Sequence, residues 1–259
     1  MTVSKSLLIG GLSVPYESAK LFVRQPNVKE ICLLTEERFF TALEWLNFDK
    51  DNVLTESDKK SLGQVDNFQL LLMILNGKVQ NINQVEDIKE AISSLFLLLF
   101  PDYNLVIQEG GFILFNNENP SEYSIISIEC FNDFKDILNA IFPVLKEGEE
   151  ENYRTTTKKG KELADKFKAR KKKLAQMKAN EKRDAANIKA SLIQEMVSIL
   201  SIGNHITVNE ILDKYTFYQL FYQYKRLRTK IDYDTMVKLR LAGAEDVPDS
   251  EHWLSTLSL

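Results

Sequence analysis

Apolar side chains along the first 145 residues occur in short runs separated by turns, a pattern that predicts both strands and helices. Ser6–Ile9 and Lys20–Arg24 have the composition of strands, and the loop between them contains two glycines and a proline. Helical spacing follows in two segments, which begin at the predicted N-caps Asn27 and Thr35. The apolar positions of these two helices are Val28, Ile31, Cys32, Phe39, Phe40, Leu43 and Leu46.

Three longer helical patterns follow in the rest of this region. Asp66–Asn76 is a leucine-rich run of helical length. A second helix is predicted to begin at Asn81 or Asn83 and to end before Pro101, because proline does not continue a helix. Phe131–Leu145 repeats the helical spacing, so we expect a third amphipathic helix there.

A β-hairpin is the clearest local motif in the chain. Asn104–Glu109 and Phe112–Asn116 flank Gly110-Gly111, and two adjacent glycines supply the positive φ angles that a two-residue turn requires. Tyr123–Glu129 is a predicted third strand. Residues 1–148 are therefore predicted to form an α+β domain with a small antiparallel sheet.

Residues 149–190 form a charged segment that is predicted to link two folded domains. Arg154–Lys189 contains 14 basic and four acidic residues, and its content of Ala, Lys, Glu and Gln favours a long helix. Residues 191–259 are predicted to form an all-α domain, in which Gly203 ends the first helix. The predicted order is an α+β domain, a basic helical linker and a C-terminal helical domain.

Charge is distributed unevenly over this arrangement. The whole chain has a net charge of -4, but residues 1–150 contain 12 basic and 23 acidic residues, a net charge of −11. Residues 151–259 contain 21 basic and 14 acidic residues, a net charge of +7. Because most of the positive charge lies in the linker, we interpret the chain as two acidic folded parts joined by one basic arm.

Cysteine content and hydrophobicity exclude several classes of protein. Two cysteines do not make a disulfide framework, which indicates a reducing compartment. The longest apolar runs, Leu70–Leu75 and Leu95–Phe100, are far shorter than the roughly 18 residues that a membrane-spanning helix needs. We therefore expect no membrane association, and we interpret the apolar N-terminal stretch as a strand and turn, not as a signal peptide.

The sequence contains no residue set with the spacing of a catalytic or metal site. His205 and His252 have no Cys, His or carboxylate at ligand spacing, so we expect exposed or capping histidines. Cys32 and Cys130 lie in apolar patterns and are expected to be small core residues. Neither glycine pair is followed by the Lys-Ser/Thr of a phosphate loop. We therefore predict that the protein is not an enzyme and holds no cofactor and no metal.

Aromatic residues are concentrated at the start of the last predicted helix. Helical spacing places Phe217, Phe221 and Tyr224 on the face expected to be in the core, and it places Tyr218 and Tyr222 elsewhere. Tyrosine combines a large apolar area with a polar tip, which suits an interface. The candidate partner-binding residues are Phe217, Tyr218, Phe221, Tyr222 and Tyr224, with Tyr218 and Tyr222 as the outward-facing part.

The basic arm has three interpretations that the sequence leaves open. Its cations could neutralise phosphates and bind nucleic acid, although Phe167 is the one residue in the arm that could stack on a base. The arm could instead dock on an acidic protein surface, in this chain or in a partner. It could also be a solvated helix or a flexible arm. The candidate residues are Lys166, Lys168, Arg170, Lys171, Lys172 and Lys173.

Two stretches carry motifs that resemble a known family. The first is Val14-Pro15 … Lys20-Leu-Phe-Val-Arg-Gln-Pro26-Asn-Val-Lys-Glu-Ile31 … Phe39-Phe40, and the second is Ile211-Leu-Asp-Lys-Tyr-Thr216-Phe-Tyr-Gln-Leu220. An extended stretch ending in Gln-Pro, a helix with Val-x-Glu-Ile and a late Thr-aromatic-Tyr-Gln-Leu helix start resemble the tail-assembly chaperones of tailed bacteriophages. The layout of a folded front part, a charged linker and a helical back part is also similar to theirs.

This resemblance implies a non-enzymatic protein that binds the long, helical tape-measure protein while tail-tube subunits polymerise around it. Proteins that assist baseplate-hub assembly have a similar layout, so a hub protein is an alternative partner. A structural baseplate or tail component retained in the virion, and a nucleic-acid-associated structural protein that uses the basic arm, are the alternative functions. The implied location is the cytoplasm of the host cell, or the virion, and homo-oligomerisation stays open.

Overall fold

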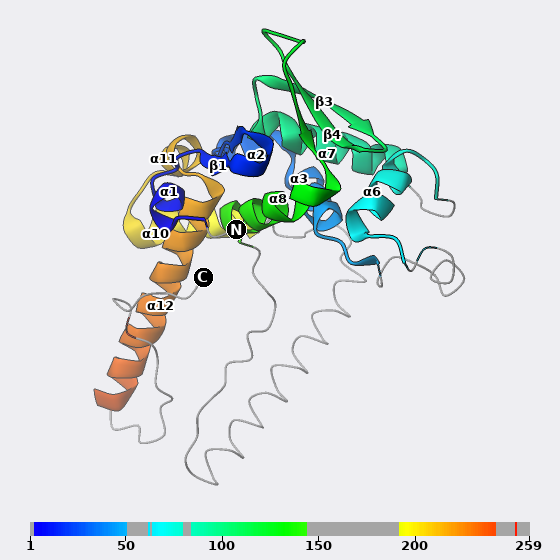
Figure 1. Ribbon diagram of the computed structural model, residues 1–259. Helices are drawn as coiled ribbons and strands as arrows, with labels where there is room; N and C mark the ends of the chain where they lie inside the picture. Colours follow the sequence, from blue (N-terminus) through cyan, green and yellow to red (C-terminus); the bar gives the residue numbers. More distant parts are fainter. Residues whose placement is uncertain are drawn as a thin grey trace. The chain divides into compact units, whose positions relative to one another are not determined.

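The computed structural model describes residues 3–50, 64–79, 84–143 and 192–241, together with residues 62 and 252 (Figure 1). Small antiparallel sheets lie in the first half of the chain and helices form its C-terminal region, so the predicted α+β class is confirmed. The chain divides into two compact units. Unit 1 comprises Met1–Pro143 and Ile206–Phe221, and unit 2 comprises Val144–His205 and Tyr222–Leu259.

Unit 1 is built from two separate stretches of the chain. Its second stretch, Ile206–Phe221, packs with the first 143 residues, whereas the sequence pattern places it in a C-terminal helical domain. A helical repeat shows which face of a helix is buried but not which element covers that face. The predicted linker at residues 149–190, with both of its predicted boundaries, lies outside the described residues and stays a prediction.

The first element is a helix and not the strand predicted for Ser6–Ile9. α1 spans Lys5–Ile9. A run of a few apolar residues fits either structure, and periodicity cannot separate the two in so short a segment. The buried Gln25 fixes the helix from outside, because its Nε2 donates to the carbonyl oxygens of Leu7 at 3.1 Å and Leu12 at 2.6 Å.

β1 (Val14–Tyr16) and β2 (Leu21–Val23) form a two-stranded antiparallel sheet, joined by the short 3-10 helix η1 (Glu17–Ala19). The strand predicted around β2 is confirmed. The sequence pattern predicts a loop at β1, which contains Pro15, and proline cannot donate a hydrogen bond to a neighbouring strand. Both strands of a two-stranded sheet are edges, however, and an edge tolerates proline.

α2 (Val28–Leu34) and α3 (Glu36–Leu46) begin at the predicted caps. Asn27 Oδ1 accepts from the amide of Glu30 at 2.9 Å, and Glu30 Oε2 accepts from the amide of Asn27 at 2.9 Å. This reciprocal pair is a capping box, which satisfies two backbone donors that the helix itself leaves unpaired. Thr35 caps α3, as its position before the second apolar stripe predicts.

α6 (Asn67–Leu75) and α7 (Val85–Leu99) occupy the positions of the next two predicted helices. Asp66 Oδ1 caps α6 by accepting from the amide of Phe68 at 2.8 Å. The starting positions predicted for the second helix, at residues 81 and 83, lie outside the described residues. The buried positions of α7 recur at helical spacing and are Ile88, Ala91, Ile92, Leu95, Phe96 and Leu99.

Three antiparallel strands form the second sheet, in the order β3 (Tyr103–Gln108), β4 (Gly111–Asn116) and β5 (Tyr123–Ile126). The predicted hairpin is confirmed, but its turn lies one residue earlier than predicted. Gln108 pairs with Gly111, so the two turn residues are Glu109 and Gly110.

Gly111 is needed for a different reason from the one the glycine pair suggests. It adopts a φ of 146°, whereas Gly110 is not among the residues with positive φ. A Cβ at position 111 would overlap the carbonyl oxygen of Ile126 on the neighbouring strand. The glycine therefore allows β4 and β5 to approach each other, and it does not form the turn.

One face of this sheet packs on α6, α7 and α8 (Ile128–Ile141), which lie beneath it in Figure 1. Phe112, from β4, contacts one phenylalanine ring of each helix. The centroid distances are 5.3 Å to Phe68, 5.1 Å to Phe96 and 6.3 Å to Phe131. Burial of these large apolar rings at one point contributes to the packing that joins the sheet to the helices.

Tyr16 connects the small sheet to the same core. Its ring stacks on Phe134 at a centroid distance of 5.8 Å, and its hydroxyl donates to the carbonyl oxygen of Cys130 at 2.8 Å. We expect Tyr16→Phe to lower the free energy of unfolding by about 1–2 kcal/mol, because the buried carbonyl loses its donor while the ring stays in place. Urea unfolding followed by circular dichroism measures this loss, and Tyr123→Phe, on an exposed tyrosine, is the matched control.

The pH dependence of stability gives a second measurement on the same variant. Burial raises the pKa of Tyr16, so the folded protein keeps a proton that the unfolded chain releases above about pH 10. The stabilising contribution is therefore complete below that pH and is lost as the pH rises. We expect the stability of Tyr16→Phe to fall less steeply above pH 10 than that of the unchanged protein, and equal slopes would contradict this assignment.

The C-terminal helices are α10 (Leu192–Asn204), α11 (Val208–Lys214) and α12 (Phe217–Leu241). The prediction that Gly203 ends the first of them is wrong, because α10 continues through Asn204 and His205 adopts the left-handed φ of 56°. Gly203 has a packing role instead. The side chain of Leu227, on α12, lies where a Cβ at position 203 would be, so the glycine lets α10 and the part of α12 in unit 2 lie close together.

Candidate interaction surfaces

α12 begins with a capping box that also holds the N-terminal helix. Thr216 Oγ1 accepts from the amide of Gln219 at 3.3 Å, and Gln219 Oε1 accepts from the amide of Thr216 at 2.9 Å. Gln219 Nε2 donates to the carbonyl oxygen of Ile9 at 2.8 Å. The glutamine of the Thr-aromatic-Tyr-Gln-Leu motif thus starts α12 and fixes the end of α1.

The two stretches that resemble tail-assembly chaperones contact each other in unit 1. The amide of Val28 donates to the carbonyl oxygen of Tyr215 at 2.9 Å. The neighbouring residues Asn27 and Thr216 form an antiparallel β-bridge. The Gln-Pro-Asn-Val segment and the Tyr-Thr-Phe segment, far apart in sequence, are therefore parts of one structure.

A surface ion pair extends this junction. Lys29 Nζ lies 2.8 Å from Asp213 Oδ1, and it joins α2 to α11. The hydrogen bond to the Asp213 carboxylate raises the pKa of Lys29. Both side chains are more than half exposed. We therefore expect this pair to add little to the free energy of unfolding and to act mainly on how α2 is aligned with α11.

Three of the five predicted partner-binding aromatic residues are buried. The ring of Phe217 packs against Phe39 and Phe142, each at a centroid distance of 5.7 Å. Phe221 is buried as well, which agrees with its predicted place on the core face. The prediction that Tyr218 projects away from the core is wrong, because its side chain is only 2% exposed. A prediction from helical spacing assumes that one face of a helix is buried and the opposite face is exposed, whereas both faces of the first turn of α12 are buried.

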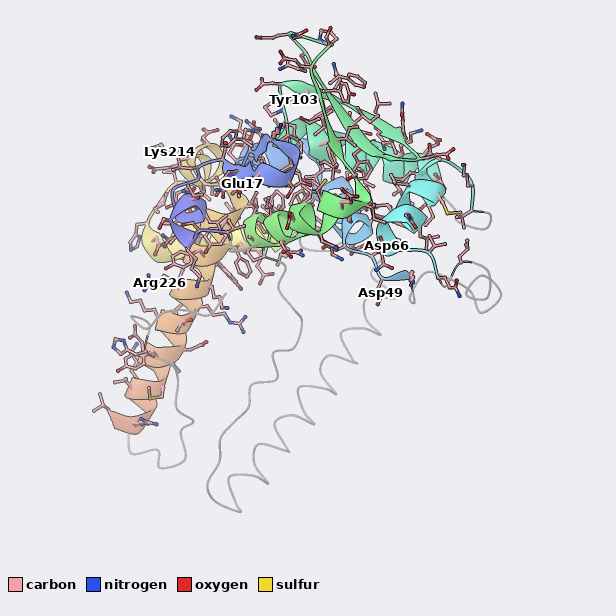
Figure 2. All side chains as sticks on the ribbon, viewed as in Figure 1. Glu17, Asp49, Asp66, Tyr103, Lys214 and Arg226 are labelled. Carbon is pink, nitrogen blue, oxygen red and sulfur yellow. The ribbon has the colours of Figure 1, made fainter. Side chains whose placement is uncertain are left out.

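Tyr222 and Tyr224 are half-buried and lie just after this buried turn. The guanidinium of Arg226 covers the Tyr222 ring, with its Cζ 5.6 Å from the ring centroid, and Arg226 Nη1 donates to the tyrosine hydroxyl at 3.1 Å. Figure 2 labels Arg226 on α12. A half-buried tyrosine beside an arginine has the composition of an interface anchor.

The rest of α12 is cationic and has exposed apolar positions. Residues 222–241 contain six basic and two acidic residues. Ile231 is 51% exposed and Leu241 is 83% exposed. This segment therefore presents both charge and apolar area to solvent, whereas the first turn of the same helix does not.

Among the described residues, no group of three or more His, Cys, Asp or Glu side chains is placed to hold a metal ion. The prediction that Cys32 lies in the core is wrong, because Cys32 is exposed, while Cys130 is buried as predicted. Partial desolvation and the nearby Glu36 carboxylate raise the pKa of the Cys32 thiol, which disfavours the nucleophilic thiolate. His252 is exposed, and the centroid of its ring lies 4.6 Å from the centroid of the Tyr233 ring.

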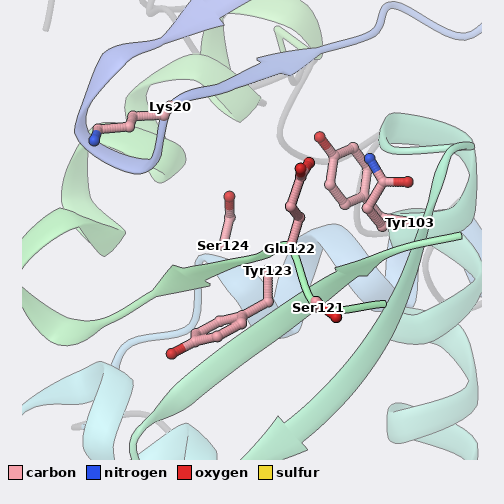
Figure 3. A pocket seen from close by; sticks show the side chains of 7 residues that line it. Lys20, Tyr103, Ser121, Glu122, Tyr123 and Ser124 are labelled. Atoms are coloured by element: carbon pink, nitrogen blue, oxygen red, sulfur yellow. The ribbon is translucent and has the colours of Figure 1, made fainter. Parts of the chain in front are cut away.

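A polar hollow of about 370 Å³ lies in unit 1 between the three-stranded sheet and the turn before β2. Figure 3 shows Tyr103, Glu122 and Ser124 on the sheet side and Lys20 on the other side. One cation, one carboxylate and a few hydroxyl groups can form hydrogen bonds to a small polar molecule. The described lining residues include no histidine and no cysteine.

None of the described helices is both long enough and apolar enough to cross a lipid bilayer. The predicted basic-arm residues lie outside the described residues, so their role stays a prediction. They are Lys166, Lys168, Arg170, Lys171, Lys172 and Lys173.

A protein-family model described as the YomV second domain matches residues 181–258. The match covers less than a third of the chain and includes α10, α11 and α12. The YomV family is phage-derived, from the SPbeta region of a Bacillus phage, so the match suggests a phage origin. No curated protein and no solved structure matches the chain.

Proposed function

We propose that this chain is a non-enzymatic phage morphogenesis protein, a tail or baseplate assembly chaperone that binds a helical tape-measure or hub protein. The observation that carries the proposal is the match of residues 181–258 to a phage-derived family. The two motif stretches add the chaperone role by their resemblance. The proposed place of action is the cytoplasm of the infected cell.

The junction between the motif stretches supports this proposal. Residues that resemble one family only by isolated short motifs need not be close in space. Here the amide of Val28 pairs with the carbonyl of Tyr215, and Gln219 reaches back to Ile9. Both motifs therefore act on one structural element, the anchored start of α12.

The proposed binding surface is the part of α12 that follows the anchored turn. It lies inside the region that matches the family model and begins with Tyr222 and Tyr224. In this mechanism unit 1 holds the first turn rigidly, and residues 222–241 present aromatic, apolar and cationic groups to a helix of the partner. Helix-face recognition of this kind depends on a few aromatic and arginine anchors.

Affinity purification of the tagged full chain from phage-infected cells, followed by mass spectrometry, tests the proposal. We expect recovery of a long helical tail protein in amounts that nuclease treatment does not change. Loss of the partners after nuclease treatment would favour the nucleic-acid-associated alternative. Retention of the chain in purified virions at a fixed stoichiometry would favour the structural-component alternative.

A double variant tests the surface itself. We expect Tyr222→Ala/Tyr224→Ala to reduce binding of the recovered partner at least tenfold, because both aromatic anchors are removed from the exposed part of α12. Phe22→Ala, which removes an exposed aromatic ring from β2 in unit 1, is the matched control and should bind as the unchanged chain does. Full binding by a folded double variant would remove α12 from the mechanism.

A further inference from the structure

The outer face of the three-stranded sheet carries an apolar patch at its centre. Strand register places Val106, Ile113 and Ile125 next to one another across β3, β4 and β5. Phe115 and Tyr123 form the neighbouring cross-strand pair, with ring centroids 5.9 Å apart. We call these five residues the outer sheet face.

These side chains point away from the helices that cover the other face. Tyr123 is 59% exposed, Ile125 is 41% exposed and Val106 is 39% exposed. An antiparallel sheet that covers a core on one side normally alternates apolar residues inside with polar residues outside. Here the outside positions Ile113, Phe115, Tyr123 and Ile125 of β4 and β5 are apolar, and on β3 Val106 extends the patch between the polar Asn104 and Gln108. A contiguous apolar patch of this kind marks an interaction site.

The segment of sequence that forms the sheet carries only negative formal charge. No Lys or Arg occurs between Lys89 and Lys135, an interval that contains seven acidic residues. Glu109 lies in the β3–β4 turn, at one end of the sheet, and Glu118 lies in the β4–β5 connection, at the other end. Glu122 lines the polar hollow together with Lys20 and does not border the outer sheet face. Lys78, from outside the sheet, pairs with Glu109 at 2.5 Å.

We infer that the outer sheet face is a docking surface for a basic, amphipathic segment of a partner protein. The apolar residues of that segment cover Val106, Ile125 and Tyr123, and its cations meet the carboxylates of Glu109 and Glu118 at the two ends of the sheet. Charge complementarity determines the class of partner, because the same carboxylates repel nucleic acid and anionic lipid. This surface belongs to unit 1 and does not involve residues 222–241, so the inference does not depend on the proposed function.

Binding of a defined peptide to the full chain tests the inference. The probe is an 18-residue amphipathic helix made of leucine and lysine, and its counterpart has glutamate in place of lysine. We expect titration calorimetry to detect the lysine peptide and not the glutamate peptide, with an affinity that falls as salt is raised. Equal binding of the two peptides would overturn the charge argument.

Two variants locate the binding site. We expect Val106→Thr/Ile125→Thr to weaken binding of the lysine peptide at least tenfold, since threonine keeps the strand preference but removes apolar area. Phe22→Thr is the matched control, because it removes a 69% exposed aromatic residue from the other sheet, and it should leave binding unchanged. Circular dichroism confirms that each variant is folded.

A carboxylate variant tests the charge at one end of the sheet. Glu118→Gln should reduce the salt dependence of peptide binding without abolishing it. Unchanged binding by the folded Val106→Thr/Ile125→Thr variant would overturn the inference. The inference would also be overturned if the full chain forms a dimer and the Val106→Thr/Ile125→Thr variant is a monomer, because a second copy of the chain would then be the occupant. The Tyr222→Ala/Tyr224→Ala variant should bind the peptide normally, which keeps this test separate from that of α12.

Discussion

Gly111→Ala is expected to lower the free energy of unfolding by about 3–5 kcal/mol, which is the largest effect that we predict for a single methyl group. Two costs add at this position. Alanine must adopt the φ of 146° that the strand imposes, and its Cβ must displace the carbonyl oxygen of Ile126. That carbonyl belongs to the backbone of β5, so it cannot move without breaking the register of β4 and β5.

Gly110→Ala is the matched control for this prediction. A Cβ at position 110 meets nothing within 4 Å, and the residue does not need a positive φ. We expect the free energy of unfolding to change by at most about 0.5 kcal/mol. Alanine causes no clash here, and it slightly restricts the unfolded chain, which offsets any small cost in the folded state. Urea unfolding followed by circular dichroism compares the two variants, and equal stabilities would show that the glycine pair acts through the turn after all.

The second large effect is expected for Phe217→Ala, with a loss of about 3–5 kcal/mol. The Phe217 ring fills the space between Phe39 of α3 and Phe142 at the end of α8. Its removal leaves a cavity that rigid neighbouring rings fill poorly. Because the ring joins the two sequence stretches of unit 1, hydrogen exchange should accelerate in α3 and in α11 together.

Ile231→Ala provides the comparison on the same helix. Ile231 is 51% exposed, so we expect a loss below about 1 kcal/mol and no change of exchange in α3. A Phe217→Ala variant that is as stable as Ile231→Ala but has lost its partner would return Phe217 to the binding surface. The pair of variants therefore separates a core role from a docking role at the start of α12.

Local signals in the sequence identified most helices correctly. Asn27, Thr35 and Thr216 all serve as N-caps, since capping depends on side chains within three residues of the helix start. The leucine-rich α6 was equally clear. The amphipathic α8 was predicted from Phe131, but it begins at Ile128, inside the strand predicted over Tyr123–Glu129, and β5 ends at Ile126. For Ser6–Ile9 the local signal was insufficient, and the helix is fixed by Gln25, a residue that no pattern in α1 indicates.

Positions that depend on contacts distant in sequence could not be predicted. The hairpin turn is displaced by one residue because β5, not the turn, determines where a glycine is required. Tyr218 was expected at the surface because helical spacing cannot show that the first turn of α12 packs in the same unit as residues 1–143, where its side chains are buried. The outer sheet face was also missed, since a strand pattern does not tell which of two apolar faces is covered.

The contact between α2 and α11 determines when unit 1 can finish folding during synthesis of the chain. Lys29 and Asp213 are 184 residues apart in the sequence. At roughly 5–20 residues per second, a ribosome needs on the order of 10–40 s to pass from one to the other. During that interval the surfaces of α2 and α3 that Tyr215 and Phe217 later cover have no partner from their own chain. Completion of unit 1 is therefore timed by translation.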